Sequence, residues 1–227
     1  MSKLKWTSAL AGGVLAALAA GSAAQACEVT VGLVLELTGP AGQYGQAGAK
    51  SVEMAFRDLN DAGGVLDGCK LVTDTRDSQS QGNVAVDQAT QLVNIKKVPV
   101  VIGGIISSVS IPILTSVTAP AGVVQVSPAS SSPTLTQLAR DGKSGGYFFR
   151  TITSDALQGT AAAKYAIDQG LNKLAIIHVN NDFGVNMVRE FSSAFEKLGG
   201  TITSTTPYNE KQASYSAEAS AAMAGEP

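Results

Sequence analysis

The chain has 227 residues, of which 44% are apolar and 15% are charged, and its formal net charge is −2. This composition is typical of a globular protein with one or two domains and excludes an intrinsically disordered chain. The small net charge and an aromatic content of 5% argue against nucleic acid as a partner.

The first 26 residues have the pattern of a secretory signal peptide. Lys3 and Lys5 form a short basic segment, residues 9–20 are apolar and uncharged, and residues 24–26 (AQA) form a small-x-small cleavage site. We expect cleavage after Ala26, which leaves a mature chain with 14 basic and 18 acidic residues in the periplasm. No later stretch is apolar enough for a membrane span.

Cys27 follows the expected cleavage site, and Cys69 is the other cysteine of the chain. A cysteine at this position could carry a lipid, but Ala24 and Gln25 depart from the residues that usually precede a lipoprotein cysteine. Two cysteines in an oxidising compartment favour one disulfide instead. The sequence leaves the lipid anchor open as the alternative.

Strand and helix patterns alternate along the rest of the chain. Apolar, β-branched runs predict strands at residues 29–36, 70–75, 99–102, 122–126, 147–150, 174–178 and 201–207. Apolar residues at helical spacing predict helices near residues 52–59, 85–93, 107–118, 156–167, 188–198 and 213–224, with Ser154 and Asp155 capping the fourth.

This alternation predicts an α/β fold with two Rossmann-like (flavodoxin-like) lobes built on parallel sheets. The first lobe covers residues 27–149, with an expected strand order of 2-1-3-4-5. The second begins after it and has only two strands, fewer than a parallel sheet normally has. We therefore expect the chain to be the front part of a longer protein.

Three loops should meet at the carboxyl ends of the first-lobe strands, where open α/β sheets bind ligands. These loops cover residues 39–48, 103–108 and 127–132, are rich in glycine or serine, and contain no Lys or Arg. Ser107 and Ser108, at the start of a helix, offer donors to a single carboxylate, and Tyr44 offers a wall. The simpler interpretations are that the two serines are helix caps, that the loop glycines form turns and that Tyr44 is an ordinary surface residue.

Catalysis has little support in the sequence. His178 is the single histidine and ends a predicted strand, and no G-x-S-x-G motif presents a nucleophile. We favour a structural His178 over an acid-base role. No cluster of side chains has metal-ligand spacing, so we expect neither a metal nor a cofactor.

Six stretches in order resemble the type I periplasmic solute-binding proteins of the leucine/isoleucine/valine-binding family. They are GLVLELTGPAGQYGQ, LNDAGGVLDGCKLVTDTRDSQS, VVIGGIISSVS, VSPASSSPTLT, YFFRTITSDALQG and HVNNDFG. The resemblance covers essentially the whole mature chain. It implies a monomeric, non-enzymatic receptor whose two hinged lobes close on an amino acid or a related small carboxylate and then dock on an ABC permease.

The resemblance also implies site residues. Ser107, the backbone of Ala129 and the hydroxyl of Ser131 would hold the ligand's α-carboxylate. Tyr44 would line the pocket, and Phe183 would face the ligand from the second lobe, where the family often has a tyrosine. The candidate set further includes Ser108 and Ser130. Within the serine run, Ser130 and Ser132 are interpreted as turn residues, and Pro133 as the residue that fixes the exit.

Residues 149–153 would form the first hinge crossing, which assigns residues 150–227 to this crossing and a partial C-terminal lobe. The acidic residue that pairs with the ligand's ammonium in relatives would lie beyond Pro227. We expect the 227-residue chain to bind weakly or not at all and to be poorly stable. Cys27 and Cys69 precede strands that would be parallel neighbours, so a bridge between them fits. The alternatives are a sensory domain of a receptor or regulator with the same fold, and an exported enzyme.

Overall fold

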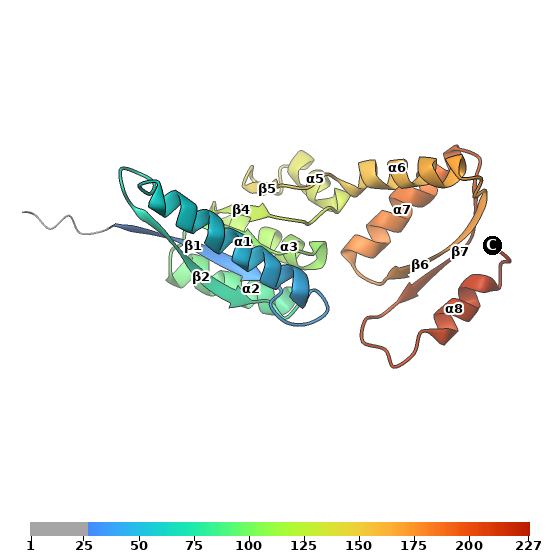
Figure 1. Cartoon of the computed structure of the whole chain (residues 1–227), viewed down its shortest axis with the longest axis horizontal. Coiled ribbons are helices and arrows are strands. Elements are labelled where there is room, and N and C mark those ends of the chain that lie inside the picture. Colours follow the sequence, from blue (N-terminus) through green and yellow to red (C-terminus); the bar gives the residue numbers. More distant parts are fainter. Residues whose placement is uncertain (1–26) are drawn as a thin grey trace, which may run out of the picture.

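The computed structural model describes residues 27–227, so the predicted signal peptide and its predicted cleavage site lie outside the described residues. The first lobe is built on one parallel sheet with the strand order β2-β1-β3-β4-β5 (Figure 1). Its strands are β1 (Glu28–Leu35), β2 (Lys70–Asp77), β3 (Val100–Gly103), β4 (Val124–Ser127) and β5 (Phe148–Arg150). This order confirms the sequence prediction.

Alternation along β1 determines how helices cover the sheet. Val31, Leu33 and Leu35 join a buried cluster with residues of α1 (Gly42–Asp61), which Figure 1 shows lying across β1 and β2. Val34 joins a second buried cluster with residues of α2 (Gly82–Thr90) and α3 (Ser107–Ile113). Because successive side chains of a strand point to opposite faces, this one strand anchors both helical layers.

Both helices that cover the second face continue in wider turns. After α2 the chain forms the π-helical turn η1 (Gln91–Ile95), and after α3 it forms η2 (Leu114–Thr118) and α4 (Ala119–Ala121). Pro112 lies inside α3, where it removes an N–H and disturbs the regular ladder. Gly122, at a φ of 66°, ends the helix, although the sequence pattern assigned it to the next strand.

One helix of the first lobe was not predicted. Residues after the serine run form α5 (Pro133–Arg140), with Pro133 in its first turn. The Ser132 hydroxyl accepts the Thr134 N–H at 3.2 Å and so caps this helix. Ser132 is therefore the residue that starts α5 and not only part of a turn, and Pro133 begins the helix.

The second lobe contains a two-stranded parallel sheet of β6 (Lys173–Val179) and β7 (Thr201–Tyr208). Its helices are α6 (Asp155–Asp168), α7 (Asp182–Lys197) and α8 (Ser216–Met223). The predicted cap of α6 is confirmed, because the Ser154 hydroxyl accepts the Ala156 N–H at 3.4 Å. The core is small, and an apolar cavity of about 480 Å³ lies over β6 and α7.

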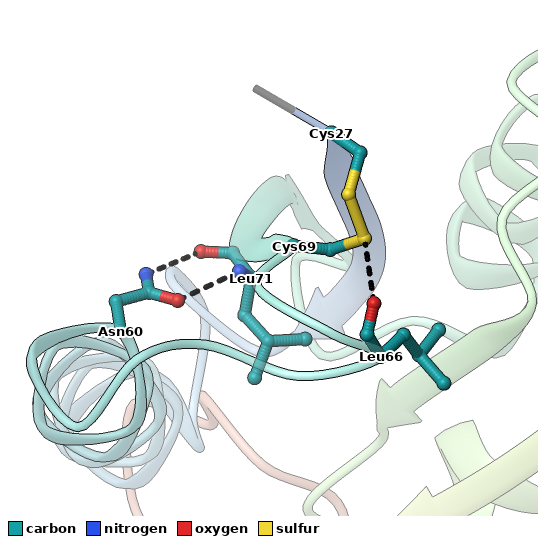
Figure 2. The surroundings of a disulfide bond; sticks show 5 residues. All are labelled: Cys27, Asn60, Leu66, Cys69 and Leu71. Carbon is teal, nitrogen blue, oxygen red and sulfur yellow. Dashed lines mark hydrogen bonds between the residues drawn. A yellow bond between two sulfur atoms is a disulfide. The ribbon is translucent and has the colours of Figure 1, made fainter. Parts of the chain in front are cut away.

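A disulfide joins Cys27 to Cys69, with their Cα atoms 4.6 Å apart (Figure 2). The two cysteines precede β1 and β2, which pair in parallel from Glu28 opposite Lys70. The predicted bridge is thus confirmed, and it uses the Cys27 sulfur on which a lipid would be carried. Within residues 27–227, no helix has the length and apolar character needed to cross a membrane.

Candidate ligand-binding site

A pocket of about 300 Å³ lies at the carboxyl ends of the first-lobe strands. The start of α7 in the second lobe also contributes to it. Five of the seven predicted ligand residues line this pocket, together with two isoleucines of the β3–α3 loop. The lining residues are Tyr44, Ile105, Ile106, Ser107, Ala129, Ser131 and Phe183. Residues far apart in the sequence therefore converge at the edge that the sheet topology predicted.

Ser107 connects two of the pocket loops. Its side chain is buried, and its Oγ accepts the backbone N–H of Ser132 at 3.1 Å. A serine hydroxyl has one hydrogen to donate, and this contact leaves that hydrogen free. The backbone N–H groups of Ser107, Ala129 and Ser131 also have no protein acceptor among residues 27–227. Three residues that line the pocket thus carry donors without a protein acceptor in the described part of the chain.

Ser108 and Ser130 do not line the pocket. Ser130 is fully buried beneath it, where its Oγ lies 2.6 Å from Ser110 Oγ and donates to the Ile105 carbonyl at 3.1 Å. The Ser130 N–H donates to Ser127 Oγ at 2.9 Å. These contacts hold the serine loop against the β3–α3 loop. Ser108 lies on α3, with its carbonyl oxygen close to Gly82 at the start of α2.

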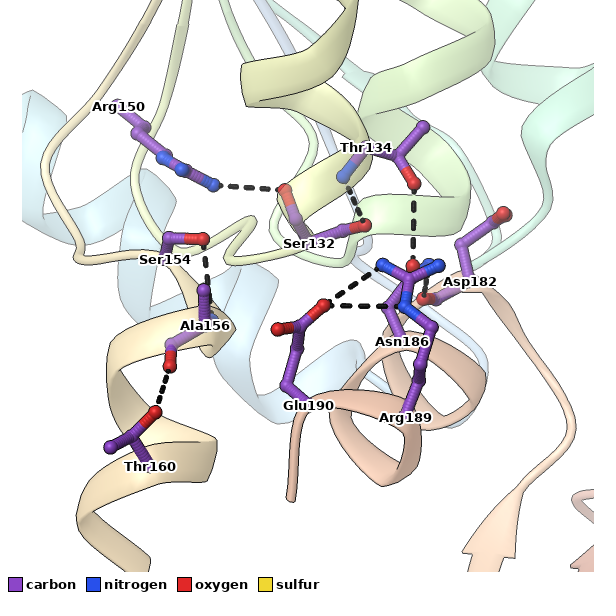
Figure 3. Close-up of polar contacts among 10 residues, drawn as sticks. All are labelled: Ser132, Thr134, Arg150, Ser154, Ala156, Thr160, Asp182, Asn186, Arg189 and Glu190. Carbon is purple, nitrogen blue, oxygen red and sulfur yellow. Dashed lines mark hydrogen bonds and ion pairs between the residues drawn. The ribbon is translucent and has the colours of Figure 1, made fainter. Parts of the chain in front are cut away.

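Arg150 fixes the serine loop from the end of β5. Its Nη1 donates to the carbonyl oxygen of Ser130 at 3.2 Å. The same atom donates to the carbonyl oxygen of Ser132 at 3.1 Å, as Figure 3 shows. Its Nη2 donates to the Thr136 hydroxyl on α5 at 2.8 Å. One guanidinium therefore ties β5, the loop and α5 together. The sequence pattern placed Arg150 in a strand and did not single it out.

Asp155, at the start of α6, is fully buried directly beside Ser131. Its N–H donates to the Ser131 carbonyl at 2.9 Å, while neither carboxylate oxygen has a partner in hydrogen-bonding geometry. Burial raises the pKa of this carboxyl, and the nearby Ser131 hydroxyl and Arg150 act in the opposite direction. A buried carboxylate thus stands behind one wall of the pocket.

A second buried carboxylate, Glu36, stands behind another wall. Glu36 is fully buried and accepts the N–H of Ile105 at 2.9 and 3.1 Å and the N–H of Ile106 at 3.1 Å. Burial raises its pKa, the two N–H groups act in the opposite direction, and Asp77 raises it further. Asp77 accepts N–H groups of the β1–α1 loop, including that of Leu37 at 3.0 Å.

The two lobes also meet beside the pocket. Phe183 lies in the first turn of α7. Asn181 caps this helix, because its Oδ1 accepts the Gly184 N–H at 3.0 Å. One turn further on, Asn186 accepts a hydrogen bond from the Thr134 hydroxyl of α5 at 3.5 Å (Figure 3). His178 lies in β6 and lines the second-lobe cavity instead of this pocket. Within residues 27–227 no cluster of side chains could hold a metal ion.

The fold and the pocket define an α/β protein of the two-lobed class, with a pocket to which both lobes contribute. The family model described as periplasmic binding protein matches residues 28–227, and the chain belongs to this family. The Leu/Ile/Val-binding protein homolog 1 of Brucella abortus is 30% identical over 207 residues, which are 91% of this chain and 54% of the relative. The leucine-specific-binding protein of Salmonella typhimurium is 30% identical over 83% of this chain and 49% of its own length.

A solved structure shows the same fold. The leucine-binding protein of Thermotoga maritima superposes with a TM-score of 0.78 at 24% identity, covering 88% of this chain and 54% of that chain. The present chain therefore spans about half the length of the relatives that it matches. Its two-stranded second sheet fits this difference, because the second lobe is incomplete compared with theirs.

Proposed function

We propose that this chain provides the first-lobe half of an amino acid site in a periplasmic solute-binding protein. The observation that carries the proposal is the pocket in which Ser107, Ala129 and Ser131 present donors without protein acceptors. Three N–H groups and one free hydroxyl suit a single carboxylate, because hydrogen bonds to an ionised acceptor are the strong ones. Tyr44 and the two isoleucines suit an apolar side chain.

The role is binding, not catalysis. Family members are solute-binding proteins. The Salmonella typhimurium relative binds leucine according to its name, and the Brucella abortus relative is named as a homolog of a Leu/Ile/Val-binding protein. By this likeness, the ligand is a branched-chain amino acid or a related small carboxylate. The protein acts as a monomer in the periplasm, where its two lobes close on the ligand and present it to an ABC permease.

The proposal can be tested by titrating the isotope-labelled full chain with L-leucine and following its amide signals by NMR. This method detects weak binding, which is the regime expected for half of a site. We expect shifts centred on the amides of Ser107, Ala129 and Ser131. The control ligand is 3-methylbutylamine, which is leucine without its carboxylate. Equal shifts with both ligands, or shifts centred on the second-lobe cavity, would contradict the proposal.

A further inference from the structure

Glu36 places a carboxyl group directly behind the pocket, and this group carries a negative charge when it is ionised. Its carboxylate is fully buried and bonds to the N–H groups of Ile105 and Ile106, which both line the pocket. Consecutive Cα atoms are about 3.8 Å apart, so the N–H of Ser107 lies within about 7 Å of the Glu36 carboxylate. A ligand carboxylate bound to that N–H would lie within about 10 Å of it.

No cation neutralises this charge in the part of the chain that the structure describes, since none of its ion pairs includes Glu36. The titratable group that faces Glu36 is Asp77 at the end of β2, which carries the same sign. Gly45 of α1 packs against the Glu36 backbone, and Gly104 of the β3–α3 loop packs against its Oε1. Neither glycine brings a charge, so the N–H groups of Ile105 and Ile106, and no cation, offset the field of Glu36 at the pocket.

We propose that Glu36 makes the site select zwitterions over plain monocarboxylates. A ligand with a net negative charge is repelled, whereas an amino acid carries an ammonium that offsets the repulsion on its carboxylate. Two unit charges about 10 Å apart at an effective dielectric constant of about 20 correspond to about a tenfold change in a binding constant. This inference rests on the proposed function, because it takes Ser107 as the carboxylate contact.

The test compares L-leucine with 4-methylpentanoate, its analogue without the amino group. Both are titrated by NMR into the full chain and into the Glu36→Gln variant. We expect Glu36→Gln to strengthen binding of 4-methylpentanoate about tenfold and of leucine by clearly less, so that the preference for leucine shrinks. The matched control is Glu53→Gln, which removes an exposed charge from α1 and should leave the preference unchanged.

The wild-type chain provides a second measurement that a purely structural role would not affect. Protonation of Glu36 removes its charge, so 4-methylpentanoate should bind more tightly as the pH falls. The midpoint of this change should equal the midpoint at which the side-chain carboxyl carbon signal of Glu36 titrates. Because this pH series uses only the wild-type chain, it tests the role of Glu36 even if the Glu36→Gln variant fails to fold. Binding of leucine should change much less over the same range.

The outcomes separate the two claims. If neither ligand binds the wild-type chain, the proposed function fails and this inference fails with it. If both bind but their ratio is the same in wild type and Glu36→Gln, the inference alone is wrong. A change in affinity that does not follow the Glu36 titration in the wild-type chain would overturn it as well.

Discussion

The Cys27–Cys69 disulfide should make a large contribution to the stability of the first lobe. We consider the double variant Cys27→Ser, Cys69→Ser, which removes the bridge without leaving a free thiol. The two residues are 42 positions apart in the sequence. For a loop of this length the chain-entropy relation gives about 4 kcal/mol at 25 °C, through the unfolded state that the bridge constrains. The pairing of β1 with β2 remains in the variant, since it starts at Glu28 and Lys70.

Hydrogen exchange is the suitable assay because it reports on each lobe separately. Amides in β1 and β2 that exchange through unfolding of the first lobe should lose protection by about three orders of magnitude, the equivalent of about 4 kcal/mol. Amides in β6 and β7 should change little, which provides an internal control. Adding a reductant to the wild-type protein should reproduce the behaviour of the double variant.

Two results would refute the reasoning. One is a loss below about 1 kcal/mol in the double variant, which would mean that the bridge does not constrain the unfolded chain as the relation assumes. The other is non-reducing peptide mapping of the exported protein that finds two free thiols or a lipid on Cys27. The second result would also reopen the lipid-anchor alternative.

Three further predictions concern the serine loop and its supports. Ser131→Ala removes the hydroxyl that the family resemblance assigns to the ligand's carboxylate, and it should weaken leucine binding by about 1–2 kcal/mol in an NMR titration. Ser132→Ala should affect binding far less. It should lower the free energy of unfolding in urea by about 1 kcal/mol, because Ser132 caps α5. Equal losses of leucine affinity in Ser131→Ala and Ser132→Ala would mean that the serine loop has a structural role and does not bind the ligand directly. Asp155→Asn should stabilise the protein at neutral pH, because burial raises the pKa of Asp155 and its ionised carboxyl therefore opposes folding. This gain in the free energy of unfolding should vanish as the pH falls below 3.8, the ordinary pKa of an aspartate, where the carboxyl is protonated in both states. A constant gain across a urea-melt pH series would contradict this. Arg150→Lys should destabilise the loop, because a lysine cannot reach both carbonyls and the Thr136 hydroxyl as a fork, and an unchanged urea midpoint would count against that role.

The sheet order could be predicted because strand and helix periodicities are long and regular in the first lobe. The helix α5 could not, because its residues follow a run of serines and its first turn contains a proline. Composition of that kind predicts a loop, whereas the Ser132 hydroxyl and Pro133 in fact start a helix. Gly122 was misassigned for a related reason: its left-handed φ, which ends a helix, cannot be read from an apolar neighbourhood.

The location of the pocket followed from topology, since parallel strands end at a common edge. The groups behind its walls could not be found in this way. Glu36 ends an apolar strand pattern, and Asp155 has the position of an ordinary helix-cap neighbour. Only the folded chain shows that both are buried and that they face Ile105 and Ser131 from behind. Sequence patterns report which side chains lie at an edge, but not which backbone groups remain without a partner there.

The loops that present the donors are held by several first-lobe contacts, to which the second lobe adds the hydrogen bond from the Asp155 N–H to the Ser131 carbonyl. Glu36 holds the β3–α3 loop, Arg150 holds the serine loop, and Ser107 links the two through the Ser132 N–H. The carboxylate site on this lobe would therefore be formed before any ligand arrives, which lowers the ordering cost of binding. What an incomplete second lobe removes is the burial of the ligand from the other side. A chain of about half the relatives' length should thus keep the geometry of its half-site while losing most of the affinity.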